Sequence, residues 1–323
     1  MSSHSGKKVV LAALAANGGI ALVKLVVAGF SGSATMLAEA VHSVADTANQ
    51  ALLLVGMTLA ARTNPARYPL GRESERYFWA FVVSLTLFLL GGVFAIFEGV
   101  HKLRAGHEGP PTSFVWPLVV LGISLVLEAS SFTVAMREFQ RERRGRPFFE
   151  ALFSGKDPTI PVVLLEDTGA VIGLLVAVVA LVVSLVTGST LPDGIGSIVI
   201  GVLLCGIGFA LAYDTHGLLI GESASPELRA QALALAQGTP GVDAVTQLLS
   251  MHLGPDSILL ALKVRFRRDL TVTEVEAAID ALEARIRAEI PAMKRIFVEP
   301  DGSYVEALDP ERASTVLGQN RSR

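Results

Sequence analysis

Long apolar stretches alternate with short polar ones over the first two thirds of the chain. A helix that crosses a bilayer needs roughly 20 predominantly apolar residues, and six stretches meet that length. They predict membrane-spanning helices at 9–30, 34–61, 77–100, 115–136, 160–186 and 195–218. The pattern therefore predicts an all-α six-helix transmembrane domain over residues 1–220.

The pattern changes near Gly221, where polar and apolar residues begin to alternate as they do in a soluble domain. Ser225 is placed to cap a helix, and Thr273 with Glu276 three residues later forms the sequence pattern of a capping box. The expected elements are a helix at 226–237, strands at 242–253 and 257–267, a helix at 273–289 and a strand at 294–299. This order predicts a small α+β domain (αββαβ, metallochaperone-like) over 221–301, followed by a polar tail at 302–323.

Composition supports a membrane protein. Hydrophobic residues make up 51% of the chain, charged residues only 18%, and mean hydropathy is +0.53, whereas a soluble domain would carry more charge. The net charge of −3 gives none of the basic excess of a nucleic-acid-binding protein. A single cysteine, Cys205, excludes a disulfide framework and a thiolate metal cluster. The short polar start shows no cleavage pattern, so no removable signal peptide is expected.

Loop charge predicts the orientation. The loops after the second and fourth spans carry ten Lys and Arg residues, and the three remaining loops carry only Lys102 and Arg104. Basic loops stay in the cytoplasm. We therefore expect cytoplasmic N- and C-termini and a multi-pass protein of a bacterial inner or plasma membrane.

Ionisable side chains within an apolar span are costly and usually functional. At about 100° per residue, four polar residues of the second span fall on one stripe of the helix: Glu39, His42, Asp46 and Asn49. His42 and Asp46 are four residues apart, so both can touch one ion. Imidazole together with carboxylate suits a cation that prefers nitrogen and oxygen ligands.

The fifth span carries adjacent acids, Glu166 and Asp167. Adjacent residues point about 100° apart on a helix, so we expect one of them to face the second span. Gly169 and Gly173 follow with the four-residue spacing that lets two helices approach closely. A site shared between the second and fifth spans needs such an approach.

Three further polar residues lie within predicted spans. Asn17 and Lys24 share a face of the first span, where Asn17 is a candidate for the ion path and Lys24 is expected to extend outward to the membrane surface. Glu128 in the fourth span could line a cavity or relay protons. The alternative for each polar residue is a purely structural hydrogen bond between helices.

These residues carry a resemblance. The run from Gly32-Ser33 through Glu39-Ala-Val-His42 to Asp46 resembles the second-span signature of the cation diffusion facilitator family, and Asp167 matches the fifth-span Asp of that family. Asp46-Thr-x-Asn-Gln50 and the stretch from Asp157-Pro to Asp167 are similar to the zinc transporter nine-like branch. The resemblance covers nearly the whole chain.

The resemblance implies a divalent metal cation transporter, with Zn²⁺ favoured, that exports the ion from the cytoplasm by proton-coupled alternating access. It also implies a homodimer, protons as the counter-ion and no organic cofactor. His42, Asp46 and Asp167 would bind the transported ion.

The sequence departs from the family pattern at Val163, where most members carry a metal-binding His or Asp. Glu166 is the first candidate to replace that ligand, followed by Asn49 and Glu39. The loop after the second span lacks the usual His residues. Few candidate ligands remain in the C-terminal domain: His252, Glu276, Glu299 and Asp301.

Other function classes stay open at this point. A membrane metalloprotease would need an H-E-x-x-H motif, which the chain lacks, and the acid pair in the fifth span is too sparse for a lipid-phosphate enzyme, so we expect no enzymatic activity. A non-transporting regulatory or assembly protein is a second class. A transporter for Mn²⁺, Fe²⁺ or Co²⁺ in place of Zn²⁺ is a third.

Overall fold

A computed structural model describes residues 2–31, 34–105, 115–143, 145–153 and 155–301. Contacts divide the chain into two compact units. The first comprises residues up to 62 together with 74–217, and the second comprises 63–73 together with the residues from 218 onward. The predicted tail at 302–323 lies outside the described residues.

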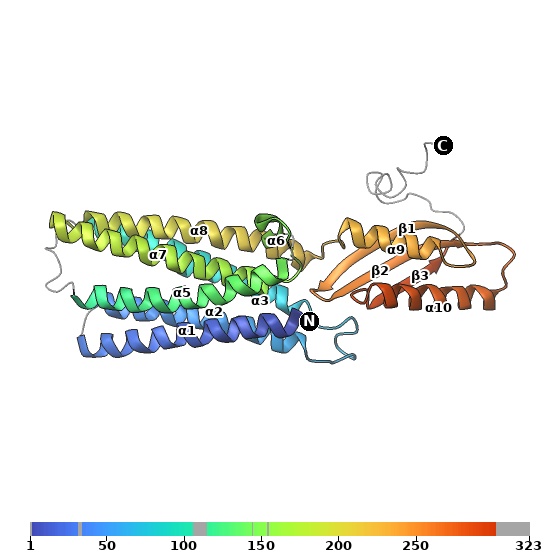
Figure 1. The fold of residues 1–323 in the computed structure, drawn as a ribbon, viewed down its shortest axis with the longest axis horizontal. Helices are drawn as coiled ribbons and strands as arrows, with labels where there is room; N and C mark the ends of the chain where they lie inside the picture. The colour runs from blue at the N-terminus through green and yellow to red at the C-terminus, as the bar shows by residue number, and fades with distance from the viewer. Residues whose placement is uncertain (1, 32–33, 106–114, 144, 154, 302–323) are drawn as a thin grey trace, which may run out of the picture. The chain divides into compact units, whose positions relative to one another are not determined.

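The regular elements in the described part of the first unit are all helical, and its long helices lie side by side (Figure 1). Its elements are α1 Ser2–Ser31, α2 Ala34–Ala60, α3 Glu75–Thr86, η1 Leu87–Val93, α4 Phe94–Ala105, α5 Val115–Arg143, α6 Phe148–Phe153, α7 Thr159–Thr187 and α8 Leu191–Ile220. The short helix α6 was not predicted, because six residues are too few to show a helical period.

Five helical segments among the described residues are long and apolar enough to cross a membrane: Val9–Val26, Glu75–Arg104, Leu118–Arg143, Thr159–Thr187 and Leu191–Ile220. The remaining predicted span, 34–61, coincides with α2, and the side chains of its first nine residues are not described. The predicted fold class, a helical membrane domain followed by a small α+β domain, is confirmed.

The outer faces of these helices are apolar. Val186 is 83% exposed and Phe209 is 67% exposed, and many other large apolar side chains of the same helices are exposed in the isolated chain. A water-soluble protein rarely exposes apolar patches of this extent, whereas lipid tails cover them without cost. The exposed apolar faces therefore fit a helix bundle surrounded by lipid.

The third predicted span is not one regular helix. A π-helical segment, η1, separates α3 from α4 and contains Gly91 and Gly92. Such π segments are rare and are frequently found near functional sites. Leu87, its first residue, lines the cavity described below.

Glycines let α8 pack tightly against this third span. A Cβ added at Gly201 would lie 2.7 Å from the carbonyl oxygen of Gly92, and one added at Gly208 would lie 2.8 Å from the backbone nitrogen of Phe88. Backbones this close leave no room for a side chain. Small residues at helix interfaces are how membrane helices gain packing contacts when water does not drive them together.

Polar contacts join the starts of α3 and α7. Arg76 donates to the carboxylate of Asp157 and, over 3.1 Å, to Thr159 Oγ1, while the backbone N–H of Thr159 donates to Asp157 Oδ1. Tyr77, fully buried, donates its hydroxyl to the carbonyl of Lys156. These contacts fix where α7 begins, and at 1.5 Å per residue they place its acids roughly 10–12 Å along the helix.

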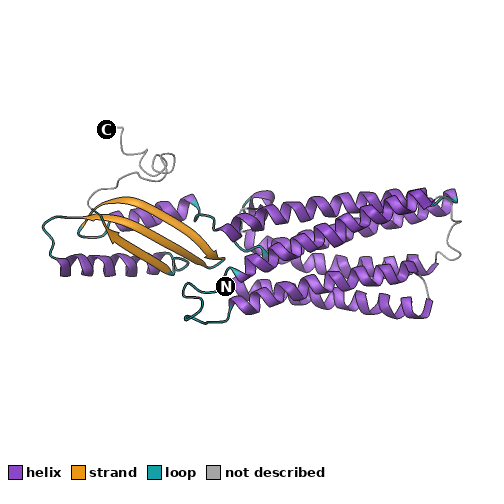
Figure 2. Cartoon of the chain, turned by 180° about the vertical axis from the view of Figure 1, so that it is seen from behind, coloured by secondary structure: helices purple, strands orange, loops and turns teal. Residues whose placement is uncertain are grey.

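The second unit contains a three-stranded sheet with two helices (Figure 2). Its elements are α9 Pro226–Gln237, β1 Val242–Gly254, β2 Ser257–Phe266, α10 Val272–Glu289 and β3 Arg295–Pro300. The strand order is β1-β2-β3, with β1 antiparallel and β3 parallel to the central β2. This is the predicted αββαβ order.

One apolar core holds this unit together. Alternate residues of β2, from Ile258 to Val264, are buried with Ala232 and Ala236 of α9 and with Leu282 and Ile286 of α10. Alternation with a period of two places these β2 side chains on one face of the sheet. Both helices therefore cover the same face.

The start of α10 differs from the prediction. Thr271, not Thr273, is the N-cap: its hydroxyl accepts from the backbone N–H of Glu274, whose carboxylate accepts from the backbone N–H of Thr271. The chain contains two overlapping Thr-x-x-Glu patterns, Thr271 with Glu274 and Thr273 with Glu276, and local sequence does not distinguish them. The predicted cap at Ser225 is confirmed, since its side chain accepts from the N–H of Leu228.

Candidate metal site

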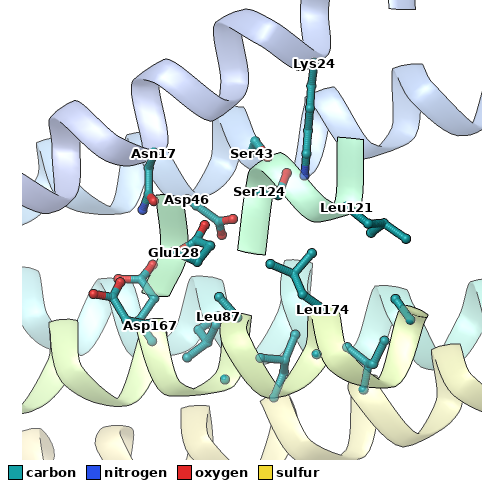
Figure 3. A pocket seen from close by; sticks show the side chains of 17 residues that line it. Asn17, Lys24, Ser43, Asp46, Leu87, Leu121, Ser124, Glu128, Asp167 and Leu174 are labelled. Atoms are coloured by element: carbon teal, nitrogen blue, oxygen red, sulfur yellow. The ribbon is translucent and has the colours of Figure 1, made fainter. Parts of the chain in front are cut away.

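A cavity of about 100 Å³ lies among the helices of the first unit. Its volume is several times the roughly 10–15 Å³ that one water molecule requires. Its polar lining comes from α1, α2, α5 and α7 (Figure 3): Asn17, Lys24, Ser43, Asp46, Ser124, Glu128, Glu166 and Asp167. Four carboxylic side chains in one enclosed space, within apolar helices, are the main chemical feature of this unit.

Asp167 on α7 is 1% exposed and uses only half of its carboxylate. Ser131 of α5 donates to Oδ2 over 2.8 Å. The other oxygen, Oδ1, has no hydrogen-bond partner among the described residues. A buried carboxylate oxygen without a donor is costly, so this atom is placed to receive a cation or a proton.

Glu166, one residue earlier, is satisfied on both oxygens. Asn49 of α2 donates to Oε1 over 3.0 Å, and Gln50 donates to Oε2 over 2.6 Å. We call these three side chains the amide clamp. Because both oxygens are already engaged, the amide clamp joins α2 to α7 and leaves Glu166 less available to an ion than Asp167.

Asp46 and Glu128 bring a second and a third helix to the cavity. Figure 3 shows both carboxylates pointing into the space beside Asp167. Glu128 interacts electrostatically with Asp46 and with Asp167. Three mutually repelling acids in one enclosed space are stabilised when a cation lies among them.

Asn17 adds a neutral oxygen from α1. The side chain is buried and lines the cavity, and its Oδ1 has no hydrogen-bond partner among the described residues. Amide and carboxylate oxygens are ligands for divalent cations. Asn17 Oδ1 and Asp167 Oδ1 are thus two buried acceptor atoms without donors in one cavity.

The predicted site residues fall into three groups. Asp46, Asp167, Glu166, Glu128 and Asn17 all line the cavity, as a metal path would require. Asn49 does not appear in that lining and instead donates to Glu166. The side chains of His42 and Glu39 lie outside the described residues, and among those described no group of three or more His, Cys, Asp or Glu is arranged to hold a metal ion.

Two predictions about neighbouring positions are wrong. Lys24 does not extend outward: it is 4% exposed and lines the cavity. The acids that it faces belong to other helices, so the local sequence of α1 could not predict this direction. Gly169 and Gly173 do not face the second span. A Cβ added at either glycine would meet α8, through Leu204 and Ile207 at the first and Ile200 at the second.

Ser124 and Ser131 of α5 and Gln50 of α2 were missed as partners, whereas Glu128 of α5 was among the predicted candidates. Ser124, Glu128 and Ser131 are spaced by four and three residues and so share one face of α5, a pattern visible in the sequence. Gln50 follows Asn49 directly, and adjacent helical residues point about 100° apart. The sequence therefore did not suggest that both side chains contact the same partner. In the structure both bind Glu166 because the helix presents its carboxylate between them.

The remaining candidate ligands in the second unit do not gather. His252 is buried with Nδ1 3.3 Å from the carbonyl of Gly254, and Glu276 is exposed. Glu299 and Asp301 both pair with Lys263, at 3.2 and 3.6 Å. The Glu299 carboxylate raises the pKa of the Lys263 ammonium.

Fold and cavity together define a polytopic membrane protein with an acidic, ion-sized chamber between its helices. The family model described as the cation efflux transmembrane domain matches residues 10–220. The chain therefore belongs to the cation efflux family, whose members transport metal cations.

Named relatives agree with this assignment. The chain is 32% identical over 265 residues to the human protein named proton-coupled zinc antiporter SLC30A9, mitochondrial, covering 81% of this chain and 45% of that protein. It is 33% identical over 244 residues to metal tolerance protein C4 of Arabidopsis thaliana, covering 75% of this chain and 53% of the relative. Magnetosome protein MamB of Paramagnetospirillum magneticum is 26% identical over 284 residues, covering 86% of this chain and 89% of the relative.

The chain spans about half the length of the first two of these relatives, 45% and 53%. The family model covers residues 10–220, which include every residue that lines the cavity. Among these three names, only that of the human relative mentions a particular metal, which is zinc.

Proposed function

We propose that this protein transports a divalent metal cation, with Zn²⁺ favoured, out of the cytoplasm in exchange for protons. The observation that carries the proposal is Asp167 Oδ1, which has no hydrogen-bond partner among the described residues and lies in an acidic cavity that also contains Asp46. Zinc and proton coupling are supported by the name of the human relative. Transport needs no covalent step, and we propose no enzymatic activity.

We propose Asp46, Asp167 and His42 as the principal ligands of the transported ion. Glu128 is the best-supported replacement for the ligand lost at Val163, because it lies in the cavity and interacts with both aspartates. Val163 itself is fully buried in the apolar core. Glu166 supports the site from the amide clamp, and Asn17 Oδ1 offers a neutral oxygen.

The balance of ligands determines the choice of metal. A site with one imidazole and several oxygens binds zinc, but it also suits Mn²⁺ and Fe²⁺, which accept oxygen-rich sites. The name of the Arabidopsis relative refers to metal tolerance without specifying one metal. A transporter of Mn²⁺, Fe²⁺ or Co²⁺ is therefore the second candidate.

Proton exchange follows from the ligand chemistry. Metal binding requires a neutral imidazole and ionised carboxylates, so loading of the ion releases any protons these groups hold. In alternating access, a bundle rearrangement then opens the cavity to the other side, where protons replace the metal. Cytoplasmic termini in a bacterial inner membrane, as loop charge indicates, would make this movement an export.

We also propose that the protein is a homodimer. Leu249, Ala261 and Phe297 lie side by side in the strand register, on the sheet face opposite the helices. Leu249 and Phe297 are exposed large apolar residues of that face. Phe297→Glu is expected to convert the detergent-solubilised dimer to a monomer in a mass measurement, and an unchanged dimer would exclude this face as the interface.

A flux assay tests the proposed function. Proteoliposomes that contain a metal-sensitive dye would be challenged with Zn²⁺, Mn²⁺, Fe²⁺, Co²⁺ and Cd²⁺ in turn, with and without a pH gradient. We expect zinc uptake that depends on the protein and slows when the gradient is dissipated. Uptake no faster than in protein-free liposomes for every metal would contradict transport and favour a regulatory or assembly role.

A further inference from the structure

A lysine lies in the cavity among the acids. Lys24 on α1 is 4% exposed and lines the same space as Asp46 and Glu128. Figure 3 shows its side chain extending from α1 into the cavity. Its apolar neighbours on α1, Leu22 and Leu25, are exposed and face away from the bundle.

A buried ammonium requires counter-charges. Removing a charge from water is costly in a membrane helix, unless acids or other polar groups compensate. Lys24 interacts electrostatically with Glu128. The cavity thus places one fixed cationic side chain among four carboxylic side chains.

A metal ion that enters this space meets carboxylates that already have a cation nearby. Suppose that an ion displaces the Lys24 ammonium from the Glu128 carboxylate. Coulomb energy scales with charge, so a monovalent ion is attracted to the carboxylate about as strongly as the ammonium was. A divalent ion gains about twice as much. Displacing the lysine costs both ions the same attraction, which cancels the gain of a monovalent ion but only about half of the gain of a divalent ion. The lysine therefore weakens the binding of both ions and leaves a net attraction only for the divalent one.

We infer that Lys24 is a specificity-determining residue that acts as a tethered counter-cation: it neutralises Glu128 and its neighbours when no metal is bound, gives way to a divalent ion, and helps to release that ion by returning. This inference rests on the proposed transport function. The motifs of the second and fifth spans contain no residue of α1. The inference gives α1 a role in selecting and releasing the ion.

The test compares Lys24→Met, which keeps the length of the side chain but removes the charge, with Lys24→Arg, which keeps the charge. The matched control is Lys7→Met, which removes an exposed charge from the same helix. Equilibrium Zn²⁺ binding is measured on the purified full chain in detergent, with and without about 100 mM K⁺ (a screening-strength salt), and zinc flux is measured in liposomes.

We expect Lys24→Met to bind Zn²⁺ at least about tenfold more tightly, because one charge at a few ångströms outweighs one tenfold step in affinity. Its flux should show a lower KM together with a lower kcat, and K⁺ should now compete. Lys24→Arg and Lys7→Met should behave as the wild type.

An unchanged or weaker zinc affinity in Lys24→Met, with K⁺ still without effect, would overturn the inference. If Lys24→Met does not fold, Lys24→Gln is measured in the same way, with the same expectation. If the wild type shows no zinc flux, the proposed transport is refuted but the inference about Lys24 is not. The binding measurement would still report whether Lys24 weakens metal binding.

Discussion

The cavity of the first unit and the sheet domain of the second treat their polar groups in opposite ways. In the sheet domain, Lys263 pairs with Glu299 and Asp301, and Thr271 and Glu274 cap each other. In the cavity, Asp167 and Asn17 each keep a buried oxygen to which no described residue donates. Satisfied polar groups stabilise a fold, whereas unsatisfied buried ones persist where a ligand completes them.

The same contrast recurs within one helix. Glu166 and Asp167 are adjacent on α7, yet the first belongs to the amide clamp and the second opens into the cavity. Substitution of a satisfied residue should mainly affect stability. Substitution of an unsatisfied one should mainly affect transport, and this difference gives each prediction below its direction.

The largest expected effect is on transport. Asp46→Asn keeps the shape of the side chain but removes a charge that faces Glu128 and Asp167. Loss of a partner outside the direct ligand shell typically costs about 10–100-fold in metal affinity or activity, so loss of a ligand charge should reduce zinc flux by at least about 100-fold. Liposome flux is the measurement.

The thermal midpoint of Asp46→Asn in detergent should stay near that of the wild type or rise, because one of several repelling acids is gone. Ser43→Ala, which changes a neutral residue of the same cavity, is the matched control and should retain most of the flux. Full flux in Asp46→Asn would contradict the proposal that Asp46 binds the transported ion.

The next effect is on stability, at the amide clamp. Glu166→Leu removes the acceptor for both Asn49 and Gln50. Each buried amide then lacks a hydrogen-bond acceptor, which should lower the free energy of unfolding by about 1–3 kcal/mol per amide. A marked fall in the thermal midpoint of the detergent-solubilised protein is expected. Glu166→Gln is the control.

Glutamine at 166 should be tolerated, because Asn49 Oδ1 and Gln50 Oε1 lack partners and could accept from its amide after rotation of the neighbouring amide groups. Equal losses of stability in Glu166→Leu and Glu166→Gln would show that charge, not hydrogen bonding, holds α2 and α7 together here.

The sequence predicted the helices and strands well, because apolar stretches and alternation are local signals. Boundaries at caps were less certain: only the folded chain distinguishes Thr271 from Thr273, since both precede a Glu by three residues. The cavity was partly predictable, because Asp46 and Asp167 stand out in apolar spans. The inward direction of Lys24 was not, since it depends on acids from α2 and α5 that no local pattern connects to α1.

The smallest expected effect is in the sheet domain. Thr271→Ala removes the N-cap of α10 and should cost about 1 kcal/mol of local stability. Hydrogen exchange of the α10 amides in the full chain measures it. Thr273→Ala is the control, because Thr273 stands at the cap position of the overlapping pattern but does not cap, and an equal effect of both substitutions would contradict the assigned cap.

This cap should also depend on pH. The Thr271 backbone N–H, and then its hydroxyl, hold the pKa of the Glu274 carboxyl below its usual value. A lowered pKa contributes stability that is present above the unfolded pKa and is lost as pH falls through the folded pKa. The difference between wild type and Thr271→Ala should therefore shrink in acid, and a difference that grows in acid would contradict the linkage.

The most direct test of the central claim is equilibrium metal binding to the purified full chain with Asp167→Asn and Glu166→Gln measured side by side. The claim is that the cation binds at the unpartnered oxygen of Asp167 and not at Glu166. We predict that Asp167→Asn lowers Zn²⁺ affinity by at least about 100-fold, as expected for a lost ligand charge, while Glu166→Gln stays within a few-fold of the wild type. Wild-type affinity in Asp167→Asn, or an equal loss in both variants, would contradict the account.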